Sequence, residues 1–438
     1  MLKFILSLIF PIWVLQLQAC ATLLVWMQVL FFWISYLLLY TRIFFPSLLT
    51  IDTIYQDSLS FFIIITIILV FLISLCFITP LIKDLTLFLT YSALFVTCLI
   101  VFSSRSIFII YFFYELALLP ILYIILKWGV YPDRLVRSLI LLIYTSFFTF
   151  PLLWCLVSYY YFSNRLLLLS SPSYLVTDFF IILLVSLSFL VKLPVYGLHL
   201  WLPIAHVEAP TIGSIILAGV LLKLGGVGLI RFSLVFKLEE CFIFFLSYLL
   251  VSLLYVTVVC RYQSDFKRIV AYSSVSHMIV VPILLLANNI LSFKCLVLVI
   301  FLHGLSSPLL FSIVGVLHLF IKTRQLVVLK NTTLLNPLFA FLCVLGFIFS
   351  VAAPPFPSFT VEVFTFFSCF CLTSLAAFVL RVYVFLSIRY RLLWLVPVVV
   401  LSKETSPYVS PRFFYIWIIP IFRSLLIGFF GLITFVFV

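Results

Sequence analysis

Long apolar runs follow one another along almost the whole chain, separated by short polar breaks. About 20 apolar residues are enough for a helix that crosses a bilayer. Only 8% of the residues are charged and 66% are hydrophobic, whereas soluble domains carry about 25% charged residues. No soluble fold could bury this much apolar surface, so the chain is predicted to lie in a membrane. The runs are long and unbroken, which predicts helices and not the short alternating strands of a β-barrel.

The spacing of the runs predicts an all-α polytopic membrane protein with about 14 helices. The N-terminal segment resembles a signal peptide but lacks a convincing small-residue cleavage site, so we expect it to form the first membrane helix. The predicted helices occupy residues 2–18, 20–44, 59–81, 84–103, 106–127, 134–162, 177–200, 211–236, 239–262, 265–288, 290–321, 336–353, 359–392 and 413–437, and the 359–392 stretch has room for a turn.

The distribution of basic residues and cysteines argues against several functions. The net charge is +13, but Lys and Arg stand singly at the ends of apolar runs, as at Lys83, Arg134 and Arg261. This placement is typical of contact with lipid headgroups and not of nucleic-acid binding. The ten cysteines are scattered, with Cys369 and Cys371 as a lone C-x-C. We therefore predict no disulfide framework, zinc site or iron–sulfur site.

Two apolar segments, 192–203 and 353–362, are interrupted by prolines. Proline removes a backbone donor and clashes with the preceding helical turn. Broken backbone at membrane depth is tolerated only where it is buried in protein or lines a wet cavity. One break lies near the middle of the chain and the other lies late, as two related halves would place them, which points to a transporter. Ordinary proline kinks remain the alternative.

Few ionisable residues are predicted to lie deep in the membrane. Among the twelve acids, only Glu115 and Glu362 lie well inside apolar runs. Lys192 and Lys223 are the lysines at similar depth, and Arg381 is the one arginine with a comparable position. A charge at the bilayer centre costs about 2.5–3.5 kcal/mol on insertion scales. The two acids and the two lysines are therefore expected to face the bundle interior and to balance one another in ion pairs.

Such deep charges favour a proton relay. Burial lowers the pKa of a lysine and a neighbouring carboxylate raises it; moving a lysine pKa from about 10.4 to near 7 takes about 4–5 kcal/mol. Opening and closing a Glu–Lys pair in a low dielectric supplies changes of that size. His277 and His303 add polar positions that are predicted to hold water between the charges. Static ion pairs that fix helix packing, with histidines in ordinary hydrogen bonds, remain the alternative.

Several motifs around these residues resemble a known family. The resemblance is to the subunit 4 family of mitochondrial NADH:ubiquinone oxidoreductase (complex I), a group of antiporter-like membrane subunits. The segment from Val191 to Pro210, which contains the motifs Lys-Leu-Pro and His-Val-Glu-Ala-Pro, is the most specific match. The other matching stretches are Phe113–Leu116 with Pro120 and Trp128–Gly129, Leu221–Gly228 with Arg231, Asp265–Lys267, Ala271–Met278 and His303–Ser307.

The resemblance implies an antiporter-like fold of about 14 helices, with two inverted five-helix repeats and broken helices 7 and 12. It implies that Glu115 pairs with Lys192, that Lys223 is the central lysine and that Glu362 is the exit-side carboxylate. The family usually has a lysine where Ile204 stands, which removes a base from that loop, and the pattern around Glu362 matches only loosely.

The resemblance also implies a setting. It places the chain in the mitochondrial inner membrane, beside other membrane-arm subunits that include antiporter-like paralogues, and among lipids such as cardiolipin, with no nucleic acid. Family members carry no redox cofactor or metal; NADH, FMN, iron–sulfur clusters and ubiquinone belong to partner subunits. The predicted parts are residues 1–103 (N-terminal membrane helices), 104–238 and 239–392 (the two halves of the core), and 393–438 (a polar loop and the C-terminal membrane helix).

Other functions remain open on the sequence. A cation/proton antiporter subunit, or another antiporter-like paralogue of the same complex, fits most of the same residues. A lipid- or glycan-modifying enzyme would use His206 and Glu208 at a membrane-surface loop, although the extended polar loops that usually hold a donor substrate are missing. A passive scaffold would use the same charges only for packing.

Overall fold

The computed structural model describes residues 58–78, 85–104, 106–129, 132–163, 178–233, 235–236, 238–321, 323–326, 337–354 and 356–399 of the 438. All regular elements in these ranges are helices, and an isolated bridge joins Asp265 and Gln325. Six of the described helices or helix pairs are long and apolar enough to cross a membrane. The predicted all-helical membrane protein is therefore confirmed for the described residues, and the predicted helices 2–18, 20–44 and 413–437 lie outside them.

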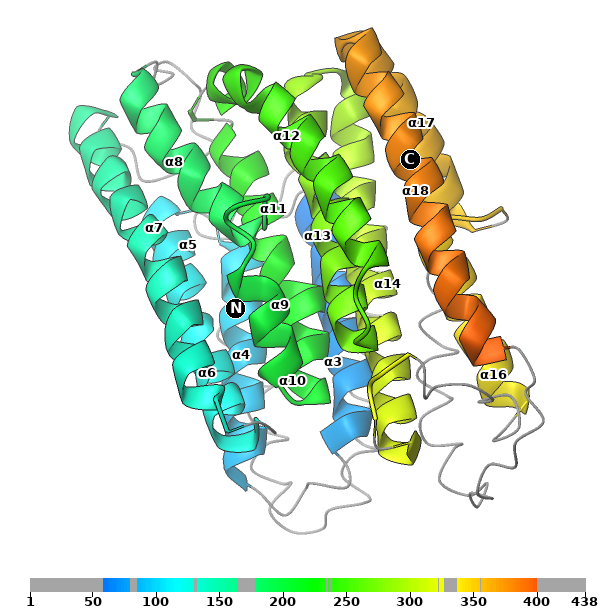
Figure 1. The fold of residues 1–438 in the computed structure, drawn as a ribbon. Helices are drawn as coiled ribbons and strands as arrows, with labels where there is room; N and C mark the ends of the chain where they lie inside the picture. Colours follow the sequence, from blue (N-terminus) through cyan, green and yellow to red (C-terminus); the bar gives the residue numbers. More distant parts are fainter. Residues whose placement is uncertain are drawn as a thin grey trace, which may run out of the picture.

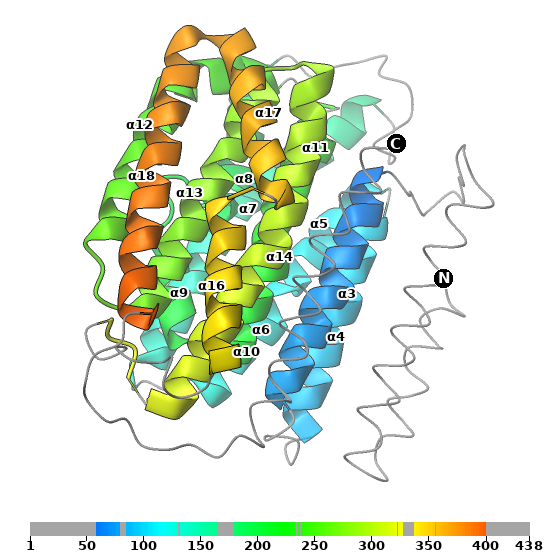
Figure 2. The ribbon, with the colours of Figure 1, turned by 90° about the vertical axis from the view of Figure 1, so that its right-hand side faces the viewer.

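The helices run lengthwise through a bundle (Figures 1 and 2). They are α3 (Ser58–Ile78), α4 (Leu85–Ser103), α5 (Ile107–Leu116), α6 (Leu118–Trp128), α7 (Arg134–Ser163), α8 (Phe179–Lys192), α9 (Trp201–Glu208), α10 (Thr211–Ile216), the π-helix η2 (Leu217–Leu221), α11 (Leu222–Ser233), α12 (Leu238–Arg261), α13 (Phe266–Leu286), α14 (Ile290–Ile321), α16 (Pro337–Val351), α17 (Pro357–Leu372) and α18 (Ser374–Val399).

Three spans form the interior of the bundle. The most apolar windows of α10–η2–α11, α14 and α13 are 100%, 89% and 83% buried, whereas those of α7 and α12 are 33% and 39% buried. A helix that is apolar all round belongs in the core of a large protein or a membrane bundle. Polar side chains on the three inner spans are therefore shielded from lipid by the other helices.

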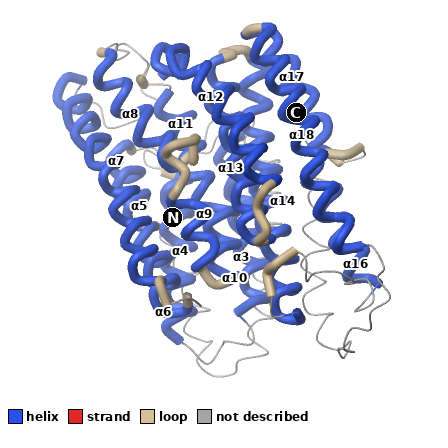
Figure 3. Tube along the Cα trace, viewed as in Figure 1, coloured by secondary structure: helices blue, strands red, loops and turns tan. Residues whose placement is uncertain are grey.

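The first predicted break is present between α8 and α9. The chain leaves the helix after Lys192 and resumes it at Trp201, visible as a loop segment in the middle of the bundle (Figure 3). Gly197 has φ +82° there, a conformation that favours glycine. The Tyr144 hydroxyl donates to the Gly197 carbonyl at 3.2 Å, and the Tyr248 hydroxyl donates to the preceding carbonyl. Side chains of α7 and α12 thus satisfy backbone groups that the break frees.

The second break is present between Val351 of α16 and Pro357 of α17. The Ser358 hydroxyl bridges it by donating to the Phe349 carbonyl at 3.0 Å. The predicted 359–392 stretch does contain a turn: it ends one helix at Leu372 and begins the next at Ser374. The predicted helices 106–127 and 211–236 are also divided, by a turn between α5 and α6 and by η2.

Candidate functional site: a polar axis inside the bundle

The first charged pair lies where two helices end. Glu115 stands next to the C-terminus of α5, and Lys192 is the last residue of α8. The Lys192 Nζ lies 3.5 Å from Glu115 Oε1, and their side chains are 5% and 26% exposed. The ammonium group also lies 2.9 Å from the centroid of the Tyr114 ring, a cation–π contact. The ion pair that the resemblance implies is present, and a cation at a helix C-terminus gains further from the helix dipole.

Lys223 lies at the centre of the bundle. It follows η2 by two residues, and the wider π-turn sits one turn before it. Its side chain is 1% exposed, and its Nζ donates to the Ala218 carbonyl at 2.7 Å. The same Nζ lies 2.6 Å from His303 Nδ1 on α14. π-Turns are frequent at functional sites, and here the turn offers a carbonyl to the lysine.

Lys223 departs from the predicted pattern of ion pairs. Two acids and two lysines were expected to balance one another, but among the described residues Lys223 is not paired with a carboxylate. Its contacts are a neutral carbonyl and an imidazole. The prediction was wrong because a helix carbonyl and a histidine on α14 supply the hydrogen-bond acceptors for this ammonium group. An amine beside an imidazole can also pass a proton, which a carbonyl alone cannot do.

Two histidines continue the row from Lys223. The ring centroids of His303 and His277 are 5.6 Å apart. The His277 Nδ1 lies 3.1 Å from the Tyr383 hydroxyl, and its Nε2 contacts the Arg391 guanidinium. A guanidinium only donates hydrogen bonds, so Nε2 must be the acceptor and Nδ1 carries the proton of the neutral ring. Arg391 thereby selects one tautomer of His277.

Glu362 lies on α17, beyond the second break. It lines a cavity of about 480 Å³ that His277 and Tyr383 also line. Arg391 acts electrostatically on Glu362 from α18. The cavity therefore joins the second histidine to the late carboxylate, although no direct contact links Glu362 to Lys223 in the described structure.

Arg391, and not Arg381, is the deep arginine of the late region. Arg391 is 3% exposed, whereas Arg381 is an exposed residue whose guanidinium lies 4.6 Å from the Phe366 ring centroid. Arg381 is exposed to the cavity that Glu362 lines and is not buried among the helices. A signal was present in the sequence: Tyr383, Ser387 and Arg391 recur every four residues, and all three are buried on one face of α18.

Three further charged side chains are buried that were not among the deep charges predicted from the sequence. Lys267 is 2% exposed and donates to the Ala209 carbonyl at 2.6 Å. Arg231 is 6% exposed and donates to the Val101 and Ser104 carbonyls at the end of α4, at 3.1 and 3.2 Å. Helix C-termini leave carbonyls without intrahelical partners, and these cations supply donors for them.

The third is Glu208, which the alternative of a lipid- or glycan-modifying enzyme would place in a membrane-surface loop together with His206. Both side chains are 0% exposed: Glu208 Oε1 lies 2.5 Å from Arg137 Nη1, and His206 stacks on Phe311. That position does not fit the enzyme alternative, because α9 packs against α7 and α13. Among the described residues, no three His, Cys, Asp or Glu side chains are grouped to hold a metal ion.

The comparisons with known proteins agree with this geometry. A model of the family described as "NADH:quinone oxidoreductase/Mrp antiporter, TM" matches residues 104–387. The chain belongs to this family. The polar axis consists of Glu115, Lys192, Lys223, His303, His277, Tyr383, Glu362 and Arg391. Every one of these residues except Arg391 lies within the matched region of this NADH:quinone oxidoreductase/Mrp antiporter family member.

Relatives with curated names narrow the resemblance. Over 298 residues, this family member is 33% identical to "NADH-ubiquinone oxidoreductase chain 4" of Artemia franciscana, which covers 68% of this chain and 76% of the relative. Over 245 residues it is 40% identical to the protein of the same name from Mytilus edulis, covering 55% and 56% of the two chains. The matched region thus spans little more than half the length of the second relative.

Solved structures show the same fold. A chain of "Respiratory complex I from Thermus thermophilus with bound NADH" superposes with a TM-score of 0.78 at 23% identity, covering 91% of this chain and 89% of the other. A chain of the same complex "with bound Aureothin" superposes with a TM-score of 0.71 at 16% identity, covering 92% and 90%. At these identities the likeness establishes the architecture alone.

Proposed function

We propose that this chain conducts protons across the mitochondrial inner membrane as a membrane-arm subunit of NADH:ubiquinone oxidoreductase (complex I). The observation that carries the proposal is the buried contact of Lys223 Nζ with His303 Nδ1 at 2.6 Å. An amine and an imidazole at hydrogen-bond distance can exchange a proton, and the His277–Glu362 cavity extends the route. Relatives carrying the chain 4 name agree with this assignment.

The architecture that we propose for the whole chain has about 14 helices in two inverted five-helix repeats, with helices 7 and 12 broken. The repeats would occupy residues 104–238 and 239–392, flanked by 1–103 and 393–438. The two broken segments support an inverted relation because they run in opposite directions: α8 lies above α9, whereas α16 lies below α17 (Figure 1). Partner subunits and anionic lipids such as cardiolipin would surround the bundle.

The proposed mechanism begins at the Glu115–Lys192 pair. NADH oxidation and ubiquinone reduction, with their FMN and iron–sulfur clusters, take place in partner subunits. A conformational change that reaches this chain opens the pair and frees the Lys192 charge to act on Lys223. Like charges repel in the low dielectric of the bundle, so protonated Lys223 then releases its proton to His303 Nδ1. Closing the pair removes the repulsion and allows Lys223 to be protonated again.

The second half of the route carries the proton to Glu362. Protonated His303 releases a proton from its other ring nitrogen to water in the cavity that His277 and Glu362 line. His277 does not itself take this proton, because its Nδ1 is already protonated and its Nε2 accepts from Arg391. The Arg391 guanidinium stays charged at all working pH values, so it keeps His277 in one tautomer and stabilises the Glu362 carboxylate. The proton leaves through Glu362 and the cavity beside it.

A cation/proton antiporter subunit, or another paralogue of complex I, is the alternative. Co-purification of this chain with flavin and iron–sulfur subunits favours the complex I assignment; isolation in an assembly without them favours the antiporter.

The test of the function is replacement of Lys223 in the assembled complex, reconstituted in proteoliposomes. Lys223→Ala is expected to abolish or sharply reduce proton pumping coupled to NADH oxidation while assembly persists. Lys223→Arg is expected to fail as well, because arginine does not release its proton. Arg389→Gln, at an exposed arginine of α18 that does not line the cavity, serves as the control and should pump normally. Normal pumping by assembled Lys223→Ala enzyme would show that the relay is wrong.

A further inference from the structure

We propose that Glu208 is a further proton-exchanging residue, which Arg137 opens and closes, and that it supplies protons to Lys223 through His206. The protons would come from the membrane face on which Asp133 lies. This inference rests on the proposed function of Lys223 and adds the side of uptake and the residues that serve it.

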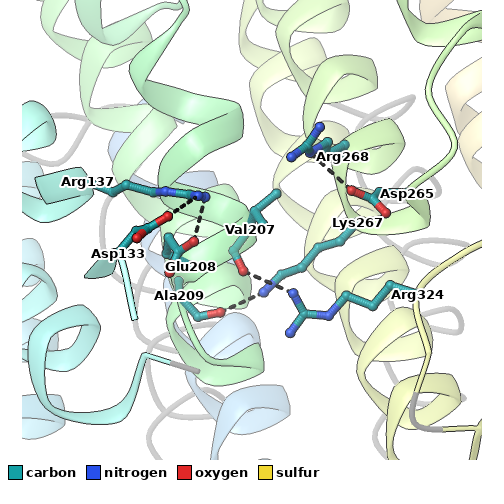
Figure 4. A network of polar contacts seen from close by, with 9 residues as sticks. All are labelled: Asp133, Arg137, Val207, Glu208, Ala209, Asp265, Lys267, Arg268 and Arg324. Atoms are coloured by element: carbon teal, nitrogen blue, oxygen red, sulfur yellow. Dashed lines mark hydrogen bonds and ion pairs between the residues drawn. The ribbon is translucent and has the colours of Figure 1, made fainter. Parts of the chain in front are cut away.

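Arg137 is shared between a buried and an exposed carboxylate. Its Nη1 lies 2.5 Å from Glu208 Oε1, and its Nη2 lies 3.1 Å from Asp133 Oδ2 (Figure 4). The side chains of Glu208, Arg137 and Asp133 are 0%, 28% and 65% exposed. Arg137 can therefore leave Glu208 and remain partnered by Asp133 and water. A buried carboxylate that loses its cation favours the protonated, neutral form.

Glu208 keeps an oxygen available for a proton. Its Oε2 has no hydrogen-bond partner among the described residues, although the atom is fully buried. Buried polar atoms that serve only packing are usually satisfied, and a buried ion pair stabilises a fold only when its remaining lone pairs are satisfied too. The free oxygen fits a group that takes up a proton or a water molecule in part of a cycle.

The neighbouring cations hold the end of α9 and not the carboxylate. Lys267 Nζ donates to the Ala209 carbonyl at 2.6 Å, and Arg324 Nη1 donates to the Val207 carbonyl at 3.1 Å (Figure 4). These contacts come from α13 and from the segment after α14, so they tie the last turn of α9 to two other elements. When the Glu208 pair opens, the moving partner is then Arg137 on α7, while the backbone at Glu208 stays in place.

His206 provides the next position toward the centre. It is 0% exposed and stacks on Phe311 with centroids 4.5 Å apart and planes at 9°. Neither ring nitrogen has a hydrogen-bond partner in the described structure, and a buried donor left unpaired destabilises the fold. His206 lies in the electrostatic range of both Lys267 and Lys223. An imidazole in this position is suited to bind a water molecule or a proton transiently.

Proton uptake proceeds from Glu208 to Lys223 by way of His206. Arg137 shifts toward Asp133, and a proton from the aqueous face binds Glu208 Oε2. Glu208 passes this proton by way of water to one His206 nitrogen, and the imidazolium releases a proton to neutral Lys223. Glu208 is again a carboxylate and Arg137 returns to it. The net change is one proton taken from the aqueous face and one bound at Lys223.

The experiment compares single and double variants of the whole complex in proteoliposomes. Glu208→Gln is expected to slow NADH-driven proton translocation about tenfold. The double variant Arg137→Gln/Glu208→Gln, which leaves no unpaired charge, should be equally slow. Asp178→Asn, at an exposed acid before α8 that has no place in the route, should stay within about twofold of the parent.

A second readout reports on protonation directly. Infrared difference spectra between the oxidised and NADH-reduced complex should show the carbonyl band of a protonated carboxylic acid that Glu208→Gln removes and Asp178→Asn keeps. If the pair is only structural, the double variant pumps normally and no carboxylic band is lost; either result overturns the inference. Normal pumping by Glu208→Gln, with Lys223→Ala inactive, would refute this inference alone and leave the proposed function standing.

Discussion

The two halves of the polar axis are built from different chemistry. The first holds an acid–base pair, Glu115 and Lys192, at the ends of two helices, and part of Glu115 reaches the protein surface. The second holds a central lysine whose contacts are a carbonyl and a histidine, inside the three most buried spans. In the proposed mechanism the pair stores charge by opening and closing, whereas the row from Lys223 would pass protons between groups that are not paired with a carboxylate. The comparison suggests that the first half drives and the second half conducts.

The largest effect is expected at His303, which is the contact of Lys223 that can accept a proton. Lys223, His303 and His277 are called the conducting row below. His303→Leu removes the imidazole from Lys223, and His303→Gln keeps a hydrogen-bonding group that cannot relay a proton. We expect both to reduce pumping by about a hundredfold, measured as proton uptake per NADH oxidised in proteoliposomes. Native gels would control for assembly. If His303→Gln pumps normally, the histidine only packs against Lys223 and the second half does not conduct through it.

An intermediate effect is expected at Arg391. Replacing it by Gln removes the guanidinium that selects the His277 tautomer and acts on Glu362. Pumping should fall about tenfold, while Arg389→Gln, on the exposed side of the same helix, changes little. Lysine would keep the charge at position 391 but not the planar guanidinium. Pumping by Arg391→Lys should therefore lie between that of the parent and that of Arg391→Gln. Equal behaviour of the two arginine-to-glutamine variants would remove Arg391 from the route.

The smallest effect is expected in the driving pair. Glu115→Gln leaves Lys192 without its carboxylate, but the partial exposure of position 115 lets water reach the ammonium group. We expect pumping to fall about threefold to tenfold, less than for His303→Leu, because the conducting row stays intact. A stopped-flow comparison of proton uptake in the two variants would rank them. The reverse ranking would mean that the pair conducts and does not merely drive.

Much of this arrangement could be predicted from the sequence. The cost of a charge in lipid singled out Glu115, Lys192, Lys223 and Glu362, and the prolines marked the breaks that begin after Lys192 and after Val351. These predictions succeed because they depend on local composition and on the solvent, which the chain itself specifies.

Other features depend on which elements cover one another. Glu208 and Lys267 looked like ends of apolar runs, yet both are buried because α9, α13 and the start of α7 meet there. Arg391 was missed because the direction of a side chain on α18 is decided by its neighbours, Tyr383 and His277. The position of a residue within an apolar run and its burial in the helix bundle are different quantities. Hydropathy predicts only the first.

The central claim is that these ionisable groups are wetted enough to exchange protons. A cryo-electron microscopy map of the whole complex that resolves ordered water tests it most directly. Our account predicts water between Lys192 and Lys223, and between His277 and Glu362. Tight apolar packing in both gaps, with no water in either, would contradict it.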